Sequence, residues 1–396
     1  MFCVHLVKRC CLAGAAILIA LVQPGQASDT RPDIIVVLTD DIGAGVINQG
    51  GYSTPTITGI AAQGIRYTSA HGAPLCTPGR VMALTGRWPS DFGISNNNPI
   101  LPAATANLGS VLKAAGYRTA MIGKWHVNRV SPLDQGFDRF YGWLKTGAPY
   151  FGDSPDVPLY DQRARASNAG YITDELAARA LEFLAAPGDE PKFLYFAPNA
   201  AHAPLPYGPA DLLARAPAQL KDYDRRRAAA ILGLDDALAR VLAAAPDALV
   251  VFSSDNSQGA NGQLRGNKGT PFEGGVTVPL YVRWPGRLPA GVIDPTPVSL
   301  VDLLPTLAEA AGAPAPEGLD GVSLLEPVPE GRGLLYAALR FEGWGVRRGQ
   351  YKLLRDYDGV PVRLFDLQVD PGERHNIAGG RSSLVGELTQ LLEAIR

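Results

Sequence analysis

The chain has 396 residues, of which 46% are hydrophobic and 19% are charged, so it can bury a large core and is too apolar to be a disordered tail. Its 36 Lys and Arg nearly balance 38 Asp and Glu, and the net charge of −2 is spread without a basic stripe, which argues against a nucleic-acid-binding protein. These values predict a globular protein of one large or two unequal domains.

Residues 1–27 have the layout of a signal peptide. A short basic start up to Arg9 is followed by the apolar residues 10–22 and by a stretch that ends in small residues. The apolar part is shorter than the roughly 18 residues that a membrane span needs. We therefore expect an exported protein, periplasmic or secreted, with no membrane span in the mature chain. A retained N-terminal anchor is the alternative.

Removal of this segment would leave one cysteine. Cys3, Cys10 and Cys11 lie within residues 1–27, and Cys76 is the fourth. A disulfide framework is therefore excluded in the mature chain. An unpaired thiol in an exported protein calls for a chemical role.

Four apolar runs, rich in β-branched and aromatic residues, read as buried strands and lead into polar residues. The runs and the residues after them are 33–38 with Asp40 and Asp41, 117–123 with Lys124 and His126, 192–197 with Asn199 and His202, and 248–252 with Asp255 and Asn256.

Helical patterns over 106–115, 173–186 and 222–245 alternate with these runs. The alternation predicts an α/β fold with a large, mostly parallel central sheet flanked by helices. In such a sheet the ligand site lies beyond the carboxyl ends of the strands, so the polar residues above are expected to converge.

The C-terminal part of the chain has a different pattern. Residues 334–367 read as short strands with turns, and 383–395 form an amphipathic pattern. We expect a large α/β domain over 28–328 and a smaller subdomain over 329–396, with an antiparallel sheet and one helix.

Asp40, Asp41, Asp255 and Asn256 form an all-oxygen set that suits Ca²⁺ or Mg²⁺ better than zinc. The alternative is that each pair merely caps a turn or helix. Two such pairs after two buried strands favour the metal.

Cys76 lies just before a predicted helix start at Pro78. A lone cysteine is ordinarily a small buried hydrophobe. Here Pro78, Gly79 and Arg80 favour a helix start that reaches the surface and a reactive thiol.

At this point the motifs resemble those of the type I sulfatases, which depend on formylglycine and belong to the alkaline phosphatase superfamily. The sequence Cys-Thr-Pro-Gly-Arg at 76–80 resembles the first family signature, and Gly-Tyr-Arg-Thr-Ala-Met-Ile-Gly-Lys-Trp-His at 116–126 resembles the second. Further likeness, in the family's order, lies at 38–43, 254–256, 267–275 and 364–377.

The resemblance implies an alkaline-phosphatase-like sandwich that hydrolyses sulfate monoesters of aryl alcohols or carbohydrates. It implies that a formylglycine-generating enzyme oxidises Cys76 to formylglycine during maturation. One hydroxyl of the hydrated aldehyde would attack sulfur, and the other would then expel sulfate. The implied cofactor is Ca²⁺ rather than Mg²⁺.

The resemblance also implies a role for each site residue. Asp40, Asp41, Asp255 and Asn256, with the modified Cys76, would bind the metal. Arg80 would orient the formylglycine, Lys124 would contact sulfate, and His126 would deprotonate the hydrate. His202 and Lys268 would act at the leaving group.

Three alternatives stay open at this stage. The first is a phosphate or phosphonate ester hydrolase of the same superfamily. The second is a non-catalytic glycan-binding relative in which Cys76 is unmodified, because Gly79 replaces the usual Ser of the signature and could slow the modification. The third is a thiol hydrolase that uses Cys76 directly, which fits poorly beside a hard metal site.

Overall fold

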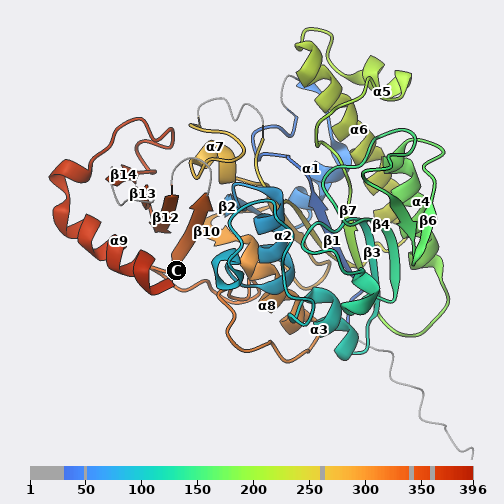
Figure 1. Cartoon of the computed structure of the whole chain (residues 1–396), viewed down its shortest axis with the longest axis horizontal. Helices are drawn as coiled ribbons and strands as arrows, with labels where there is room; N and C mark the ends of the chain where they lie inside the picture. Colours follow the sequence, from blue (N-terminus) through green and yellow to red (C-terminus); the bar gives the residue numbers. More distant parts are fainter. Residues whose placement is uncertain (1–30, 49–50, 259–263, 339–342, 357–361, 396) are drawn as a thin grey trace, which may run out of the picture. The chain divides into compact units, whose positions relative to one another are not determined.

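Ten strands form one large sheet in the computed structural model of the chain, which describes residues 31–48, 51–258, 264–338, 343–356 and 362–395 (Figure 1). The strands lie in the order β10-β2-β9-β8-β1-β7-β3-β4-β5-β6. Only β5 and β9 run against their neighbours, so the predicted mostly parallel sheet is confirmed. The bounds are β1 Ile34–Thr39, β2 Ile65–His71, β3 Arg118–Lys124, β4 Arg139–Trp143, β5 Leu159–Asp161, β6 Ala164–Ala166, β7 Lys192–Ala197, β8 Leu249–Ser254, β9 Leu280–Arg283 and β10 Val292–Ser299.

Helices cover both faces of this sheet (Figure 1). Alternate side chains of β1 point to opposite faces, which produces two cores. Ile34 and Val36 pack in the core that holds α2, α3 and α8, while Ile35 and Val37 pack in the core that holds α1, α4 and α6. The helices are α1 Pro55–Ala62, α2 Cys76–Thr85, α3 Leu108–Ala114, α4 Ile172–Ala185, α5 Ala210–Arg215, α6 Asp222–Ala243, α7 Glu273–Val276, α8 Leu303–Ala310 and α9 Ser382–Ile395.

The four strands predicted from apolar runs are β1, β3, β7 and β8. They are consecutive and parallel in the sheet, in the order β8-β1-β7-β3. Their carboxyl ends therefore lie side by side at one edge. The polar residues that follow them are thereby brought to one place.

A second, four-stranded antiparallel sheet follows, made of β11 Gly333–Ala338, β12 Gly343–Arg348, β13 Tyr351–Arg355 and β14 Val362–Asp366. Helix α9 packs against β11 and β12, with Leu388 and Leu392 buried. This confirms the predicted small sheet with one helix. The domain division between residues 328 and 329 stays a prediction.

The predicted signal peptide, with Cys3, Cys10 and Cys11, lies outside the described residues. Within the described ranges, no helix combines the length and the apolar character that crossing a bilayer requires. Cys76 is present there as a buried free thiol.

Candidate active site

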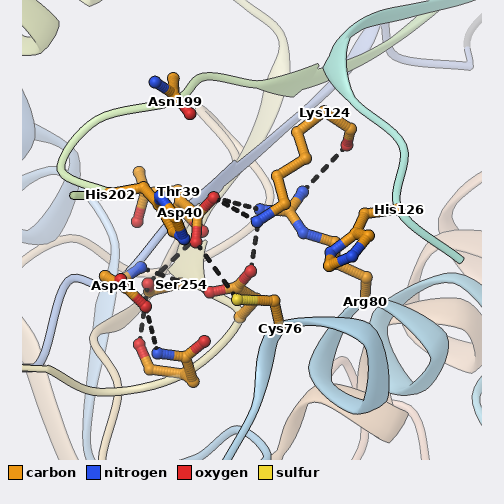
Figure 2. Close-up of polar contacts among 12 residues, drawn as sticks. Thr39, Asp40, Asp41, Cys76, Arg80, Lys124, His126, Asn199, His202 and Ser254 are labelled. Carbon is orange, nitrogen blue, oxygen red and sulfur yellow. Dashed lines mark hydrogen bonds and ion pairs between the residues drawn. The ribbon is translucent and has the colours of Figure 1, made fainter. Parts of the chain in front are cut away.

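Residues that follow four neighbouring strands meet at the carboxyl edge of the sheet (Figure 2). Asp40 and Asp41 follow β1, and Asp255 and Asn256 follow β8. His202 lies in the loop after β7, where Asp40 exchanges backbone hydrogen bonds with Ala200 and Ala201. In these bonds the Asp40 N–H donates to the Ala200 carbonyl at 3.1 Å, and the Ala201 N–H donates to the Asp40 carbonyl at 2.7 Å. Lys124 is the last residue of β3, and His126 follows it.

Cys76 is the first residue of α2, and its thiol faces this cluster (Figure 2). Its Sγ donates to the Asp40 Oδ1 at 3.6 Å. The expectation of a helix start that reaches the surface is wrong, because all ten residues of α2 are buried. The helix packs against α3, α8 and residues 300–302, and its polar members Thr77 and Arg80 find partners inside. Arg80, for example, pairs with buried carboxylates.

Four of the predicted ligands surround one point. One ligand atom each from Asp40, Asp41, Cys76 and Asp255 lies within 4.8 Å of the others, and all four residues are buried. The Asn256 Nδ2 donates to the Asp41 Oδ1 at 2.6 Å, and the Asn256 Oδ1 is buried without a hydrogen-bond donor. A buried carbonyl oxygen that lacks a donor is an open ligand position. Three carboxylates and this amide oxygen fit a hard divalent cation.

Three cationic side chains border the carboxylates. The Arg80 Nη2 lies 2.8 Å from the Asp255 Oδ2 and 3.5 Å from the Asp40 Oδ2. The Lys124 Nζ lies 2.6 Å from the Asp40 Oδ2. The Lys268 Nζ lies 2.6 Å from the Asp41 Oδ1. The predicted residues Arg80, Lys124 and Lys268 are therefore all in the cluster.

The pKa values of these buried acids diverge. Burial alone would raise the pKa of Asp40, but Lys124, His202 and Arg80 hold it well below its usual range. Burial, followed by repulsion from Asp40, raises the pKa of Asp255 to about 6. Neighbouring groups whose environments push their pKa values apart in this way are typical of functional sites.

Both predicted histidines carry a free ring nitrogen. The Nδ1 atoms of His126 and His202 are buried without a partner. Burial lowers the pKa of His126 to about 2, with Lys124 and Arg80 adding to the shift, and burial also lowers the pKa of His202. Both imidazoles are therefore neutral, and each offers a proton acceptor.

The remaining predicted groups differ in charge state. Burial raises the pKa of the Cys76 thiol in spite of the opposite influence of Lys124. The thiol is therefore protonated. Burial disfavours the Lys268 ammonium, yet neighbouring negative charge raises the pKa of Lys268 above its usual value.

Sequence reasoning missed Ser254 as a site residue. Its Oγ accepts from the Ile42 N–H at 2.9 Å and donates to the Asn256 carbonyl at 3.1 Å. It thereby joins the loop after β1 to the loop after β8, which carry all four oxygen ligands. Its position directly before Asp255 was the available signal.

Comparisons with known proteins agree with this geometry. A family profile described as Sulfatase matches residues 32–313, and one described as N-sulphoglucosamine sulphohydrolase, C-terminal, matches 267–396. Arylsulfatase A of Homo sapiens is 30% identical, over 97% of this chain and 90% of its own length. N-acetylgalactosamine-6-sulfatase of Homo sapiens is 29% identical, over 92% of this chain and 85% of its own.

A solved structure supports the same grouping. The crystal structure of Ps i-CgsB in complex with k-i-k-neocarrahexaose superposes with a TM-score of 0.85 at 28% identity, covering 92% of each chain.

Proposed function

The chain belongs to the sulfatase family, and we propose on that basis that it is an exported enzyme that hydrolyses sulfate monoesters with a formylglycine made from Cys76 and a bound calcium ion. The single observation that carries the proposal is the position of Cys76. Its Sγ lies against Asp40, in a set of ligand atoms that also includes Asp41 and Asp255 and spans at most 4.8 Å.

Asp40, Asp41, Asp255 and Asn256 would hold the metal. A calcium ion there would supply positive charge that stabilises both the attacking oxygen and the transferred sulfate oxygens. The donor set supports calcium, since it is composed of oxygen atoms and includes the orphaned Asn256 Oδ1. Magnesium, which demands a stricter octahedron, is the weaker candidate.

The formylglycine hydrate would supply one hydroxyl that attacks sulfur and a second that, on losing its proton, expels sulfate and restores the aldehyde. Arg80, in the turn after Cys76, is held by Asp255 and would fix the orientation of position 76. Lys124 would contact the sulfate group. His126, which is neutral and has a free Nδ1, would take the proton of the hydrate.

The leaving alcohol needs a proton and a nearby positive charge. Lys268 keeps its proton because its pKa is raised, and it pairs with Asp41, whereas Lys124 pairs with Asp40. His202 is neutral in the free enzyme, and a bound sulfate ester would raise its pKa by adding negative charge. These two residues would therefore serve the leaving group.

The similar proteins indicate two classes of sulfate ester as candidate substrates. N-acetylgalactosamine-6-sulfatase and the structure with a neocarrahexaose favour a carbohydrate sulfate, and arylsulfatase A favours an aryl sulfate. We propose both classes as substrates.

The test compares sulfate and phosphate monoesters of the same sugar and the same phenol, with and without a calcium chelator. We expect a higher kcat/KM for the sulfate ester and loss of turnover after chelation. A preference for phosphate would indicate the phosphate or phosphonate hydrolase instead. Binding of sulfated glycans without turnover, with a full thiol at position 76, would indicate the non-catalytic relative.

The thiol hydrolase would act with an unmodified thiol at position 76, so turnover by protein with a full thiol there would indicate it. A nucleophilic cysteine needs a lowered pKa, whereas burial raises the pKa of the Cys76 thiol. We expect Cys76→Ser to abolish sulfate release, since serine lacks the sulfur that the proposed oxidation removes. Full activity of the variant would eliminate the proposed nucleophile.

A further inference from the structure

Lys268 lies in a loop, Arg265 to Glu273, that Glu373, in the segment after β14, holds at both ends. At one end the Arg265 Nη1 donates to the Glu373 carbonyl at 3.0 Å. At the other end the Glu273 N–H donates to the Glu373 Oε2 at 2.6 Å. The two ends are also joined to each other, because the Gly274 N–H donates to the Arg265 carbonyl at 2.7 Å. One residue, Glu373, therefore closes the loop.

Glu373 is fixed in turn by buried charges. The Lys352 Nζ of β13 lies 3.0 Å from the Glu373 Oε1 and 2.8 Å from the Glu273 Oε1. Lys352 and Glu373 have no exposed surface, and Glu273 also contacts His71 at 3.0 Å and Arg347 at 3.7 Å. Burial raises the pKa of Glu373, whereas Lys352 and His71 overcome burial and lower the pKa of Glu273. Loss of any one partner would leave an unpaired buried charge, which is costly. These ion pairs therefore hold the Glu373 side chain in one position.

An apolar contact supports the same end of the loop. Phe272 packs in a small cluster with Leu354 and Phe365 of the C-terminal sheet. The Arg265 guanidinium lies 4.0 Å from the centre of the Phe272 ring. Arg265, at the start of the loop, therefore contacts both Phe272, at its end, and Glu373.

The tip of the loop faces the site already described. The Gly269 N–H donates to the Pro74 carbonyl at 2.8 Å, two residues before Cys76, and the Lys268 Nζ reaches Asp41. Lys268 thus lies between two hydrogen bonds of the loop, one from Gly269 to Pro74 near Cys76 and one from Arg265 to Glu373.

Glu373 itself has an unusual backbone. Its φ is 53°, in the left-handed region that a non-glycine residue rarely occupies. The side chain of Asp370 holds this turn by accepting from the N–H groups of Arg374 and His375, both at 2.8 Å. Strained residues of this kind persist where the surroundings enforce them, often near functional sites.

We propose that Glu373 is a positioning residue for the leaving-group step: by clamping both ends of the loop from Arg265 to Glu273, it holds Lys268 in place. The proposal rests on the proposed function, because it assigns Glu373 to the side of the site where Lys268 would act. It gives the segment around Glu373, far from Cys76 in sequence, a part in catalysis without contact with the substrate.

The kinetic test compares Glu373→Ala, Lys268→Ala and the double variant on two sulfate esters, one with a good phenolic leaving group and one with a poor sugar leaving group. We expect Glu373→Ala to lower kcat/KM for the sugar sulfate on the order of 100-fold, as a displacement of about 1 Å would. The phenol sulfate should lose much less. The double variant should match Lys268→Ala within about twofold, because both changes remove one function.

The structural test measures amide hydrogen exchange in the peptide that spans Gly266 to Val276. Glu373→Ala removes the bond to the Glu273 N–H and leaves the backbone carbonyl that binds Arg265, so exchange should rise at the Glu273 end of the loop and stay unchanged in α9. The control is Glu393→Gln, which breaks an exposed ion pair with Arg355 on the same subdomain and should leave activity and loop exchange unchanged. If Glu373→Ala does not fold, Arg265→Ala removes the Arg265 bond to the Glu373 carbonyl together with the contact on Phe272, and should give a smaller effect in the same direction.

Unchanged loop exchange in Glu373→Ala would overturn the proposal, and so would losses that multiply in the double variant. A wild-type protein without sulfatase turnover would contradict the proposed function alone, because loop exchange still decides whether the clamp exists.

Discussion

Gly79 has no side chain, and this lets the backbone of Asp255, a candidate metal ligand, approach closely. A Cβ at Gly79 would lie 2.0 Å from the Asp255 carbonyl oxygen, and one at Gly72 would lie 2.7 Å from the same atom. The Ala73 N–H donates to that oxygen at 3.3 Å. Three residues around Cys76 therefore fix the position of Asp255 through its backbone. The residue at position 79 is thus constrained by space, and its effect on Cys76 modification stays a prediction.

We expect Gly79→Ala to displace Asp255, with a loss of about 1–3 kcal/mol in unfolding free energy, as for overpacking, and weaker calcium binding. The matched control is Gly59→Ala in α1, where a Cβ meets only the end of Gln63 at 4.0 Å. That change should be neutral or stabilising, by up to about 1 kcal/mol. Denaturant unfolding and calcium titration measure both variants. Unchanged stability and calcium affinity in Gly79→Ala would show that the close approach has no consequence.

At the scale of elements, the short helix α7 carries the buried carboxylate that joins the two sheets. Burial of Glu273 is overcome by Lys352, His71 and Arg347, which lower its pKa well below the ordinary 4.5. A depressed pKa in the folded state means that this carboxylate stabilises the protein above pH 4.5, and that the contribution disappears as the pH falls below that value.

We therefore expect Glu273→Gln to destabilise the protein at pH 7 by about 3–5 kcal/mol, the usual effect of removing one partner of a buried ion pair. The difference from wild type should shrink as the pH falls below 4.5. Chemical denaturation at several pH values measures it, with Glu387→Gln, an exposed partner of Arg348, as the control. A difference that stays constant with pH would mean that Glu273 is not ionised in the folded protein.

The sequence predicted those elements whose own residues encode burial. Strands β1, β3, β7 and β8 are continuous apolar runs, and their observed bounds lie within two residues of the predicted ones. Strand β10 was not predicted because it contains Pro295 and Pro297, which are tolerated at the sheet edge where it lies. Strands β5 and β6, of three residues each, have no detectable periodicity.

The site was predictable for a similar local reason. Each of its polar residues follows a strand or belongs to a motif, so the sequence placed Asp40, Asp255 and Cys76 together. The burial of α2 was not predictable, since Thr77, Gly79 and Arg80 are not apolar and are buried through contacts with distant loops. The link from Glu373 to Glu273 joins residues 100 positions apart and leaves no local pattern.

At the scale of the whole molecule, metal binding at the site should stabilise the fold, because the ligands come from two loops that only the folded sheet brings together. Calcium at about 100 times its Kd should add about 2.7 kcal/mol, and a chelator should lower Tm accordingly. Asp255→Asn should lose most of this calcium-dependent shift in Tm.

The control for that prediction is Asp236→Asn, since Asp236 pairs with Arg215 at the surface and lies beside Asp174 and Asp211 in a separate cavity. It should keep the full shift. A shift that persists in Asp255→Asn and vanishes in Asp236→Asn would place the stabilising cation at the surface cavity.

The most direct test of the account is the chemical state of position 76 measured against activity. Protein produced with graded amounts of a formylglycine-generating enzyme is analysed by peptide mass spectrometry, and sulfate release is measured on the same samples. We expect sulfate release to rise in proportion to the fraction of Cys76 converted to the aldehyde, with none from the fully thiol form. Sulfate release that does not depend on this fraction would contradict the central claim.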